Sequence, residues 1–280
     1  MDLWLIKKFI TDALREDIGE EDITTQILVS PDLSYRKAKI VAKSAGILAG
    51  IEIAREIFHF LCPDTIFGNS YKDGDKFNSG DTLLELEASP QAILKGERVA
   101  LNFLQRLSGI ATLTDKFAKI VSPYGVKILD TRKTTPNLRL LEKYAVRVGG
   151  GLNHRINLSS GIIIKDNHIK IVGGLDKAIK IAKQKAPPFT KIEVEISNLD
   201  ELKYIIENKV DMVMLDNFSY QELKEAIKTI RNKSRQTLIE VSGGITLENA
   251  EKIAKLKPDF ISVGGLTHSA AGVDISLEVI

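Results

Sequence analysis

The sequence predicts an α/β protein made of a small α+β unit, residues 1–110, and a small or incomplete α/β barrel, residues 111–280. Beyond residue 126, short apolar runs alternate with segments of helical periodicity, as in parallel strands covered by helices. Before residue 90, alternating strands and turn pairs indicate α+β packing instead. A doubly wound open sheet is the alternative for the second part, but no Gly-x-Gly-x-x-Gly follows a first strand. The division leaves the C-terminal tail free to return to the first unit.

Composition limits the classes of partner and location. The 280 residues are 44% hydrophobic, enough for a full core, and 39 Lys and Arg against 37 Asp and Glu give a net charge of +2. That balance argues against a nucleic-acid partner or a membrane surface. No apolar run approaches the roughly 18 residues of a membrane span. The single cysteine, Cys62, cannot form an internal disulfide, and the default prediction is a cytoplasmic protein.

The first unit opens with an amphipathic helix over residues 5–14, whose periodicity distinguishes it from a signal peptide. Its further elements are expected as strands within 36–50 and at 82–87, a helix at 53–61, and a helix that starts after Ser89-Pro90. We expect Gly109 to end that helix and a second helix to run to about residue 121. His59 and Cys62 are interpreted as packing residues, because no further Cys or His near them completes a metal site.

The second unit shows six apolar runs, at residues 126–130, 161–165, 191–195, 212–216, 238–242 and 260–264. Helical segments separate them, at residues 138–147, 175–185, 199–207, 220–231 and 247–255. The last residues of the six runs are Asp130, Lys165, Glu195, Asp216, Ser242 and Gly264. Carboxyl ends of barrel strands form the floor of the active site, so these ends predict one polar rim. The plainer alternative is that polar residues only mark where strands stop.

The rim is cationic over part of its length. Residues 126–170 hold nine Lys and Arg against three Asp and Glu. The residues that we assign to a pocket are Arg132, Lys133, His154, Arg155 and Lys165. Arginine binds carboxylate or phosphate through a planar fork and lysine binds as a point charge, so this group predicts a ligand with several negative charges. The cations of the 138–147 helix, Arg139, Lys143 and Arg147, are expected to cap or pair instead.

Two acidic strand ends, Glu195 and Asp216, can hold Mg²⁺ or stabilise positive charge on a sugar ring. Glu193 and Glu240 lie two residues before strand ends, and we expect structural roles for both.

Gly-rich loops follow the last two strands. Ser242, Gly243 and Gly244 close one strand, and Gly264 closes the other. Backbone N–H groups in such loops bind phosphate, which barrels often place after their final strands. The rim therefore predicts a site for a phosphate-bearing polyanion, a divalent metal and a carboxylate ligand.

Long motifs at these residues resemble the quinolinate phosphoribosyltransferase family, nearly end to end. They include Asp-Thr-Arg-Lys-Thr-Thr-Pro at 130–136 and Ile-Lys-Asp-Asn-His at 164–168. Further matching motifs lie at 14–19, 22–25, 97–112, 142–146, 153–155, 215–217 and 242–245. Asn157 and Ser160 depart from the glycine and the acid of many relatives.

The resemblance implies a reaction in which quinolinate and phosphoribosyl pyrophosphate give nicotinate mononucleotide, pyrophosphate and CO₂ on the de novo route to NAD. It implies an N-terminal α+β open-faced sandwich domain and a C-terminal α/β barrel. It also implies Mg²⁺ as cofactor, and a homodimer or higher homo-oligomer whose active sites are shared between subunits.

The resemblance further implies a role for each site residue. Arg98 would reach into the neighbouring subunit's site, and the residues that hold the quinolinate carboxylates would be Arg132, His154 and Arg155. The residues that face the ribose and Mg²⁺ would be Glu195 and Asp216, and those that take phosphate would be Ser242, Gly243, Gly244 and Gly264. The catalytic set would be Lys133, Lys165, Glu195 and Asp216.

Three other functions fit parts of the pattern. The molybdenum-transport-associated branch of the family shares the fold, and the intact motif at 165–168 favours the phosphoribosyltransferase over it. A Schiff-base aldolase would use Lys165 as its nucleophile, which borohydride trapping would reveal. A non-catalytic protein that binds a phosphorylated metabolite would release no CO₂ from quinolinate.

Overall fold

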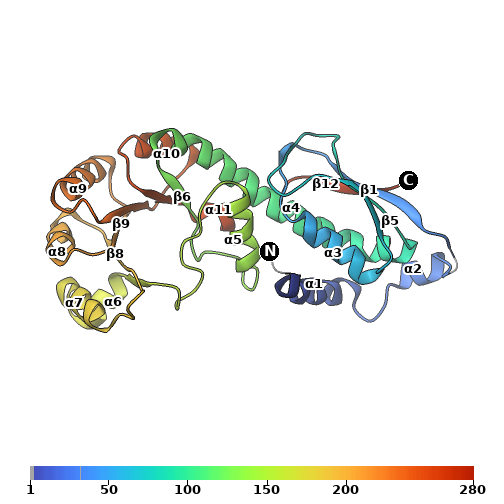
Figure 1. Cartoon of the computed structure of the whole chain (residues 1–280), viewed down its shortest axis with the longest axis horizontal. Coiled ribbons are helices and arrows are strands. Elements are labelled where there is room, and N and C mark those ends of the chain that lie inside the picture. Colours follow the sequence, from blue (N-terminus) through green and yellow to red (C-terminus); the bar gives the residue numbers. More distant parts are fainter. Residues whose placement is uncertain (1–2, 32) are drawn as a thin grey trace. The chain divides into compact units, whose positions relative to one another are not determined.

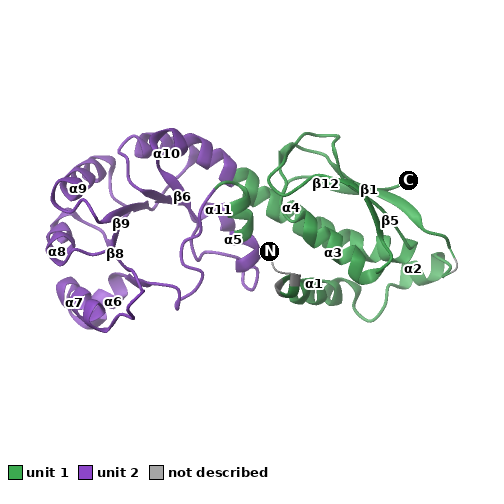
Figure 2. Cartoon of the chain, viewed as in Figure 1, with its two compact units in different colours: residues 1–113, 144–150, 270–280 green, residues 114–143, 151–269 purple. Residues whose placement is uncertain are grey.

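The computed structural model describes residues 3–31 and 33–280, which form two compact units (Figure 2). Unit 1 contains Met1–Leu113, Tyr144–Gly150 and Ala270–Ile280, and unit 2 contains Thr114–Lys143 and Gly151–Ser269. Unit 1 has an antiparallel sheet and unit 2 a parallel one, so the two-part α/β fold class is confirmed. No described helix is both long enough and apolar enough to cross a membrane.

The main sheet of unit 1 has the strand order β12-β1-β5-β3, in which all pairs are antiparallel. Its strands are β1 (Arg36–Ala42), β3 (Ile66–Ser70), β5 (Thr82–Ala88) and β12 (Ile275–Val279). A second, two-stranded sheet pairs β2 (Gly46–Ile47) with β4 (Lys76–Phe77). The helices of this part are α1 (Leu3–Ile18), α2 (Ile23–Leu28), α3 (Ile51–Leu61) and α4 (Pro90–Val121). Helices α3 and α4 lie on one side of the main sheet, as in an open-faced sandwich (Figure 1).

Helix α4 corrects one expectation, because it runs unbroken through Gly109 to Val121. The glycine is needed there for space: a Cβ at Gly109 would lie 2.1 Å from the carbonyl oxygen of Ala271. Gly109 thus permits a close approach of the segment that leads into β12, and its helical backbone needs no special conformation. A glycine in a helical pattern signals either a helix end or close packing, and the sequence alone did not separate the two.

Unit 2 carries a six-stranded parallel sheet in the order β6-β11-β10-β9-β8-β7. Its strands are β6 (Lys127–Leu129), β7 (Ile162–Ile164), β8 (Ile192–Ile196), β9 (Met212–Asp216), β10 (Leu238–Ser242) and β11 (Phe260–Ser262). Among the described residues no ladder joins β6 to β7, and an isolated parallel bridge links Leu129 to Leu152. The sheet is therefore an incomplete barrel, open between its first two strands.

Helices cover the outside of these strands, and α6 to α10 follow one another around them (Figure 1). Their bounds are α5 (Arg139–Val148), α6 (Asp166–Val172), α7 (Leu175–Lys185), α8 (Leu202–Asn208), α9 (Tyr220–Lys233), α10 (Leu247–Ala254) and α11 (Gly265–His268), with 3₁₀ turns η1 (Ser122–Tyr124) and η2 (Leu199–Glu201). Helix α6, which begins directly after Lys165, was not predicted from the sequence. It is only seven residues long, too short for periodicity to show clearly.

Candidate active site

A cavity of about 390 Å³ opens at the carboxyl ends of the barrel strands. Its lining residues are Thr131, Arg132, Lys133, His154, Arg155, Ile163, Lys165, Met214, Glu240 and Ser262. All five cations that the sequence assigned to a pocket are among them. They come from the loop after β6, the segment that crosses the open side of the barrel, and the end of β7. The fold thus brings together cations up to 33 residues apart in sequence (165 − 132).

The cations crowd one another. The pKa of Arg155 is lowered, first by burial and then by the like charge of Arg132, while Glu193 acts in the opposite direction. Arg155 also donates from Nη1 to the carbonyl oxygen of Gly161 at 2.9 Å, which fixes the guanidinium at the pocket. Like charges held close in a partly buried cavity are stabilised by an anion that binds between them.

Lys165 and Glu195 form an ion pair at the pocket edge, where the ends of β7 and β8 meet. The Lys165 side chain is 41% exposed and that of Glu195 is 16% exposed. Glu195, on the neighbouring strand, thus orients the Lys165 ammonium. Glu195 itself lies at the rim beside the cavity and is not among its lining residues.

Asp216 ends β9 and is joined to the next strand through Asn217. Asn217 donates from Nδ2 to Asp216 at 2.8 Å and from its backbone N–H to the carbonyl oxygen of Ser242 at 3.0 Å. Gly243 follows with φ +93°, and a Cβ there would lie 2.2 Å from Asn217 Oδ1. Both the backbone conformation and the space therefore require glycine at position 243.

Gly264, after β11, lies against the cationic loop. A Cβ at Gly264 would lie 3.2 Å from Lys133 Cδ, and Thr267 donates to the carbonyl oxygen of Lys133 at 2.7 Å. The two Gly-rich loops and the cations therefore occupy the same end of the sheet. Arg98 is an exposed residue of α4 in unit 1 and does not line the cavity.

Asp130 is not a rim residue, contrary to the sequence analysis. It is fully buried and forms an ion pair with Lys143 of α5, which is itself only 2% exposed. Burial raises the pKa of Asp130 and lowers that of Lys143, so each charge depends on the other. Lys143 was expected to cap a helix or to pair, and it pairs with Asp130 while it donates to the carbonyl oxygen of His154 at 3.0 Å.

The segment after α5 depends on this pair. Asp130 accepts hydrogen bonds from the His154 backbone N–H at 2.8 Å and from Asn153 Nδ2 at 2.6 Å. The backbone of His154 is thus held through its N–H by one member of the pair and through its carbonyl by the other. Residues 153–155, which have no helix or strand of their own, are positioned by side chains.

Glu193 and Glu240 form a buried cluster with His154 beneath the pocket. His154 Nε2 lies 3.0 Å from Glu193 and 3.4 Å from Glu240. Burial acts to lower the pKa of His154, but the two carboxylates outweigh it and raise the pKa to about 10. Burial raises the pKa of Glu193 to about 7 against the opposing effect of His154. In the sequence, Glu193 and Glu240 stand two residues before the rim residues Glu195 and Ser242. This spacing places each acid and its rim residue on the same face of a strand.

The contacts of the two ring nitrogens of His154 determine which of them carries a proton. His154 Nδ1 accepts the backbone N–H of Arg155 at 2.6 Å, so Nδ1 cannot also carry a proton. The hydrogen bond therefore excludes a doubly protonated ring, and the single ring proton lies on Nε2, toward the two acids.

Asn157 and Ser160, the two departures from the family pattern, lie in the turn that precedes Gly161. Asn157 Oδ1 accepts hydrogen bonds from the hydroxyls of Ser159 and Ser160, each at 2.7 Å. The turn is closed by its own polar side chains, and Gly161, its neighbour, carries the carbonyl that binds Arg155.

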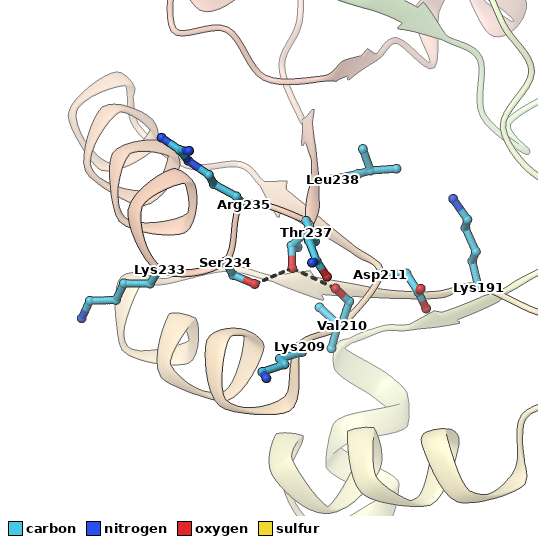
Figure 3. A pocket seen from close by; sticks show the side chains of 10 residues that line it. Lys191, Lys209, Val210, Asp211, Lys233, Ser234, Arg235, Thr237 and Leu238 are labelled. Atoms are coloured by element: carbon cyan, nitrogen blue, oxygen red, sulfur yellow. Dashed lines mark hydrogen bonds between the residues drawn. The ribbon is translucent and has the colours of Figure 1, made fainter.

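Another hollow, of about 460 Å³, lies at the amino ends of β8, β9 and β10 (Figure 3). The cations around it, Lys191, Lys209, Lys233 and Arg235, point in different directions (Figure 3). Thr237 donates to the carbonyl oxygen of Val210 at 2.9 Å and lies 2.9 Å from the Ser234 hydroxyl, a contact that ties two loops together. The convergent cations and acids lie at the other end of the strands, which is where barrels place their chemistry.

Comparisons with known proteins cover almost the whole chain. Residues 22–108 match the model of the quinolinate phosphoribosyl transferase N-terminal domain, and residues 110–278 match that of the C-terminal domain. The chain is 43% identical over 274 residues to the probable nicotinate-nucleotide pyrophosphorylase (carboxylating) of Bacillus subtilis, with 98% of this chain and 93% of the relative covered. The crystal structure of NadC from Streptococcus pyogenes is 42% identical, has a TM-score of 0.94, and aligns over 100% of this chain and 99% of its own. The nicotinate-nucleotide pyrophosphorylase structure from Francisella tularensis is 40% identical with a TM-score of 0.93, over 100% and 98% of the two chains.

Removing Lys143 is expected to destabilise the protein strongly. Lys143→Met leaves the buried Asp130 charge without a partner, a loss of about 3–5 kcal/mol of unfolding free energy. Denaturant unfolding measures it. Lys180→Met, which breaks an exposed ion pair with Asp176 on α7, is the matched control and is expected to leave stability nearly unchanged. Equal losses in the two variants would contradict a special role for the buried pair.

Proposed function

The chain belongs to the quinolinate phosphoribosyltransferase family, and we propose that the barrel pocket is where it carries out the family's reaction. The enzyme transfers phosphoribosyl from phosphoribosyl pyrophosphate to quinolinate with decarboxylation, and gives nicotinate mononucleotide, pyrophosphate and CO₂ in NAD biosynthesis. The observation that supports this pocket most strongly is its lining by four cations and His154. A dicarboxylate and a pyrophosphate ester together require such a density of positive charge.

Quinolinate binds, in this proposal, between Arg132 and Arg155. Their guanidinium groups supply planar pairs of donors that match carboxylate oxygens, and the electrostatic crowding at Arg155 is relieved when a carboxylate arrives. His154 lines the same cavity, and Lys133 and Lys165 lie where the second ligand meets the first. The cations also stabilise the negative charge that the pyridine ring carries as CO₂ leaves.

Phosphoribosyl pyrophosphate would place its 5′-phosphate on the Gly-rich loops, against Ser242, Gly243, Gly244 and Gly264. Backbone N–H groups in a loop with positive φ, such as Gly243 and Gly244, form a concave anion site. The ribose then lies toward Glu195 and Asp216. Their carboxylates stabilise the positive charge that develops on the sugar as pyrophosphate departs.

Glu195 and Asp216 also suit Mg²⁺. They project from the ends of neighbouring strands, and Mg²⁺ is usually bound by one or two carboxylates together with phosphate oxygens and waters. Bound there, the ion would neutralise charge on the leaving pyrophosphate. Lys165, paired with Glu195, keeps that carboxylate oriented toward the rim.

Arg98 supports a shared site between subunits. It is exposed on α4 of unit 1, and the cavity described above is lined only by unit 2. The family resemblance assigns the matching arginine to the neighbouring subunit's site. We therefore propose a homodimer, or a larger assembly of such dimers, in which Arg98 completes the partner's site.

Release of CO₂ from quinolinate tests the function. Wild-type protein is expected to release CO₂ only when phosphoribosyl pyrophosphate and Mg²⁺ are both present, because the ring must first become a cationic nucleotide. A protein that binds phosphoribosyl pyrophosphate but releases no CO₂ would be a binding protein, and the proposal would fail. CO₂ release that persists with excess chelator would contradict the proposed role of Mg²⁺.

Arg132→Ala and Arg155→Ala are expected to abolish turnover chiefly through lost quinolinate binding. Each removes a charge-assisted carboxylate contact of about 1.5–3 kcal/mol, which is roughly a 10- to 100-fold weaker Kd. Calorimetry with quinolinate measures the change. Arg235→Ala, at the amino ends of the strands, is the control and should bind as wild type does (Figure 3). Unchanged quinolinate affinity in the first two variants would refute their role.

Mixing two inactive variants tests the shared site. The Arg98→Ala subunit lacks the arginine that would reach into the neighbouring subunit's pocket. The Lys165→Ala subunit lacks a lysine of its own barrel pocket. In a mixed dimer one site contains both wild-type residues, so mixtures are expected to regain up to about a quarter of wild-type activity by random pairing of subunits. The readout is CO₂ release after subunit exchange, with each variant alone as the control. No recovery despite verified exchange would contradict sharing.

A further inference from the structure

Two buried acids beneath the pocket have no part in the scheme above. Glu240 of β10 is fully buried and Glu193 of β8 is 5% exposed. Neither Glu240 oxygen has a hydrogen-bond partner among the described residues, and the same holds for Glu193 Oε1 and His154 Nε2. Each acid, however, has one oxygen close to His154 Nε2, at 3.0 Å for Glu193 and 3.4 Å for Glu240. Buried carboxylates need a donor, and Nε2 is the donor that faces both.

The tautomer of His154 follows from its other nitrogen. Nδ1 accepts the N–H of Arg155 at 2.6 Å, so it is unprotonated and the ring proton lies on Nε2, toward the two acids. The three groups also resemble a metal site, with potential ligand atoms within 4.8 Å of one another. A protonated Nε2 cannot ligate a metal ion, so the arrangement is better explained as a ring N–H held close to two acids.

Both ring nitrogens of His154 are therefore used inside the protein. The ring joins the acids below to the backbone of Arg155 above, and the Arg155 guanidinium is held in turn by Gly161. If the proton moved to Nδ1, two N–H groups would face each other over 2.6 Å and the backbone bond to Arg155 would be lost. The acids oppose this change because they require the proton on Nε2.

We propose that Glu193 and Glu240 are positioning residues for quinolinate, which hold His154 in the tautomer that anchors Arg155 and so aim the Arg155 guanidinium at a substrate carboxylate. This inference rests on the proposed function for its substrate. His154 then acts through its ring position and its hydrogen bond to Arg155, and not by donating to quinolinate itself.

Glu193→Met tests the proposal, because methionine fills a similar volume without an acceptor. The quinolinate Kd is expected to weaken about tenfold, as for a lost hydrogen bond to a charged group, with phosphoribosyl pyrophosphate affinity unchanged. Glu193→Gln retains an acceptor oxygen and should restore most of the affinity. Glu240→Met serves as the second test at the longer contact, and Glu225→Met, on the exposed face of α9, is the matched control. Thermal unfolding verifies that each variant is folded.

The ring itself gives a readout that a merely structural role would not move. Nitrogen-15 NMR of histidine-labelled protein, with His154→Gln to assign the signal among four histidines, is expected to show the proton on Nε2 in wild type and mixed tautomers in Glu193→Met. A proton on Nδ1 in the wild type, or wild-type quinolinate affinity in folded Glu193→Met and Glu240→Met, would overturn the proposal. The tautomer is measured without substrate, so it remains decisive even if CO₂ release fails.

Discussion

The buried ion pair of Asp130 and Lys143 is the constraint on which the substrate pocket depends. Among the described residues no ladder joins β6 to β7, and the chain that crosses this opening pairs with a strand only at the isolated bridge between Leu152 and Leu129. Asp130 and Lys143 fix the position of this segment, because they bind the backbone N–H and the carbonyl oxygen of His154. Burial disfavours each charge, so removing either residue would leave the other as an unpaired buried charge. The open barrel can hold a precise site because this pair adds side-chain contacts where backbone pairing is limited to one bridge.

Charge in the barrel is arranged in layers. Cations lie at the mouth, and the acids Glu193 and Glu240 lie beneath them with His154 between. Acids at this depth offset the repulsion among the cations while the pocket is empty. The mouth remains positive, so it attracts anions.

Much of the fold could be predicted from the sequence because its signals are local. The apolar runs that became β9 and β10 have the predicted bounds, as has helix α7, since parallel strands and amphipathic helices carry their pattern within a few residues. The errors arose from contacts distant in sequence. Gly109 faces Ala271, 162 residues later (271 − 109), and was read as a helix end. Asp130 was placed on the rim because nothing in the sequence pattern identifies Lys143 of α5 as its buried partner. The cationic group was recognisable by composition, whereas the role of Glu193 and Glu240 required the tautomer of His154.

The pairing of β12 with β1 has a consequence for biosynthesis. Strand β12 follows every barrel strand in the chain, yet it completes the sheet of the other unit. During translation, one edge of β1 therefore stays unpaired until the whole barrel sequence has been synthesised. An unpaired strand edge can associate with other nascent chains. The order in which this protein is synthesised differs from the order in which its units can be finished.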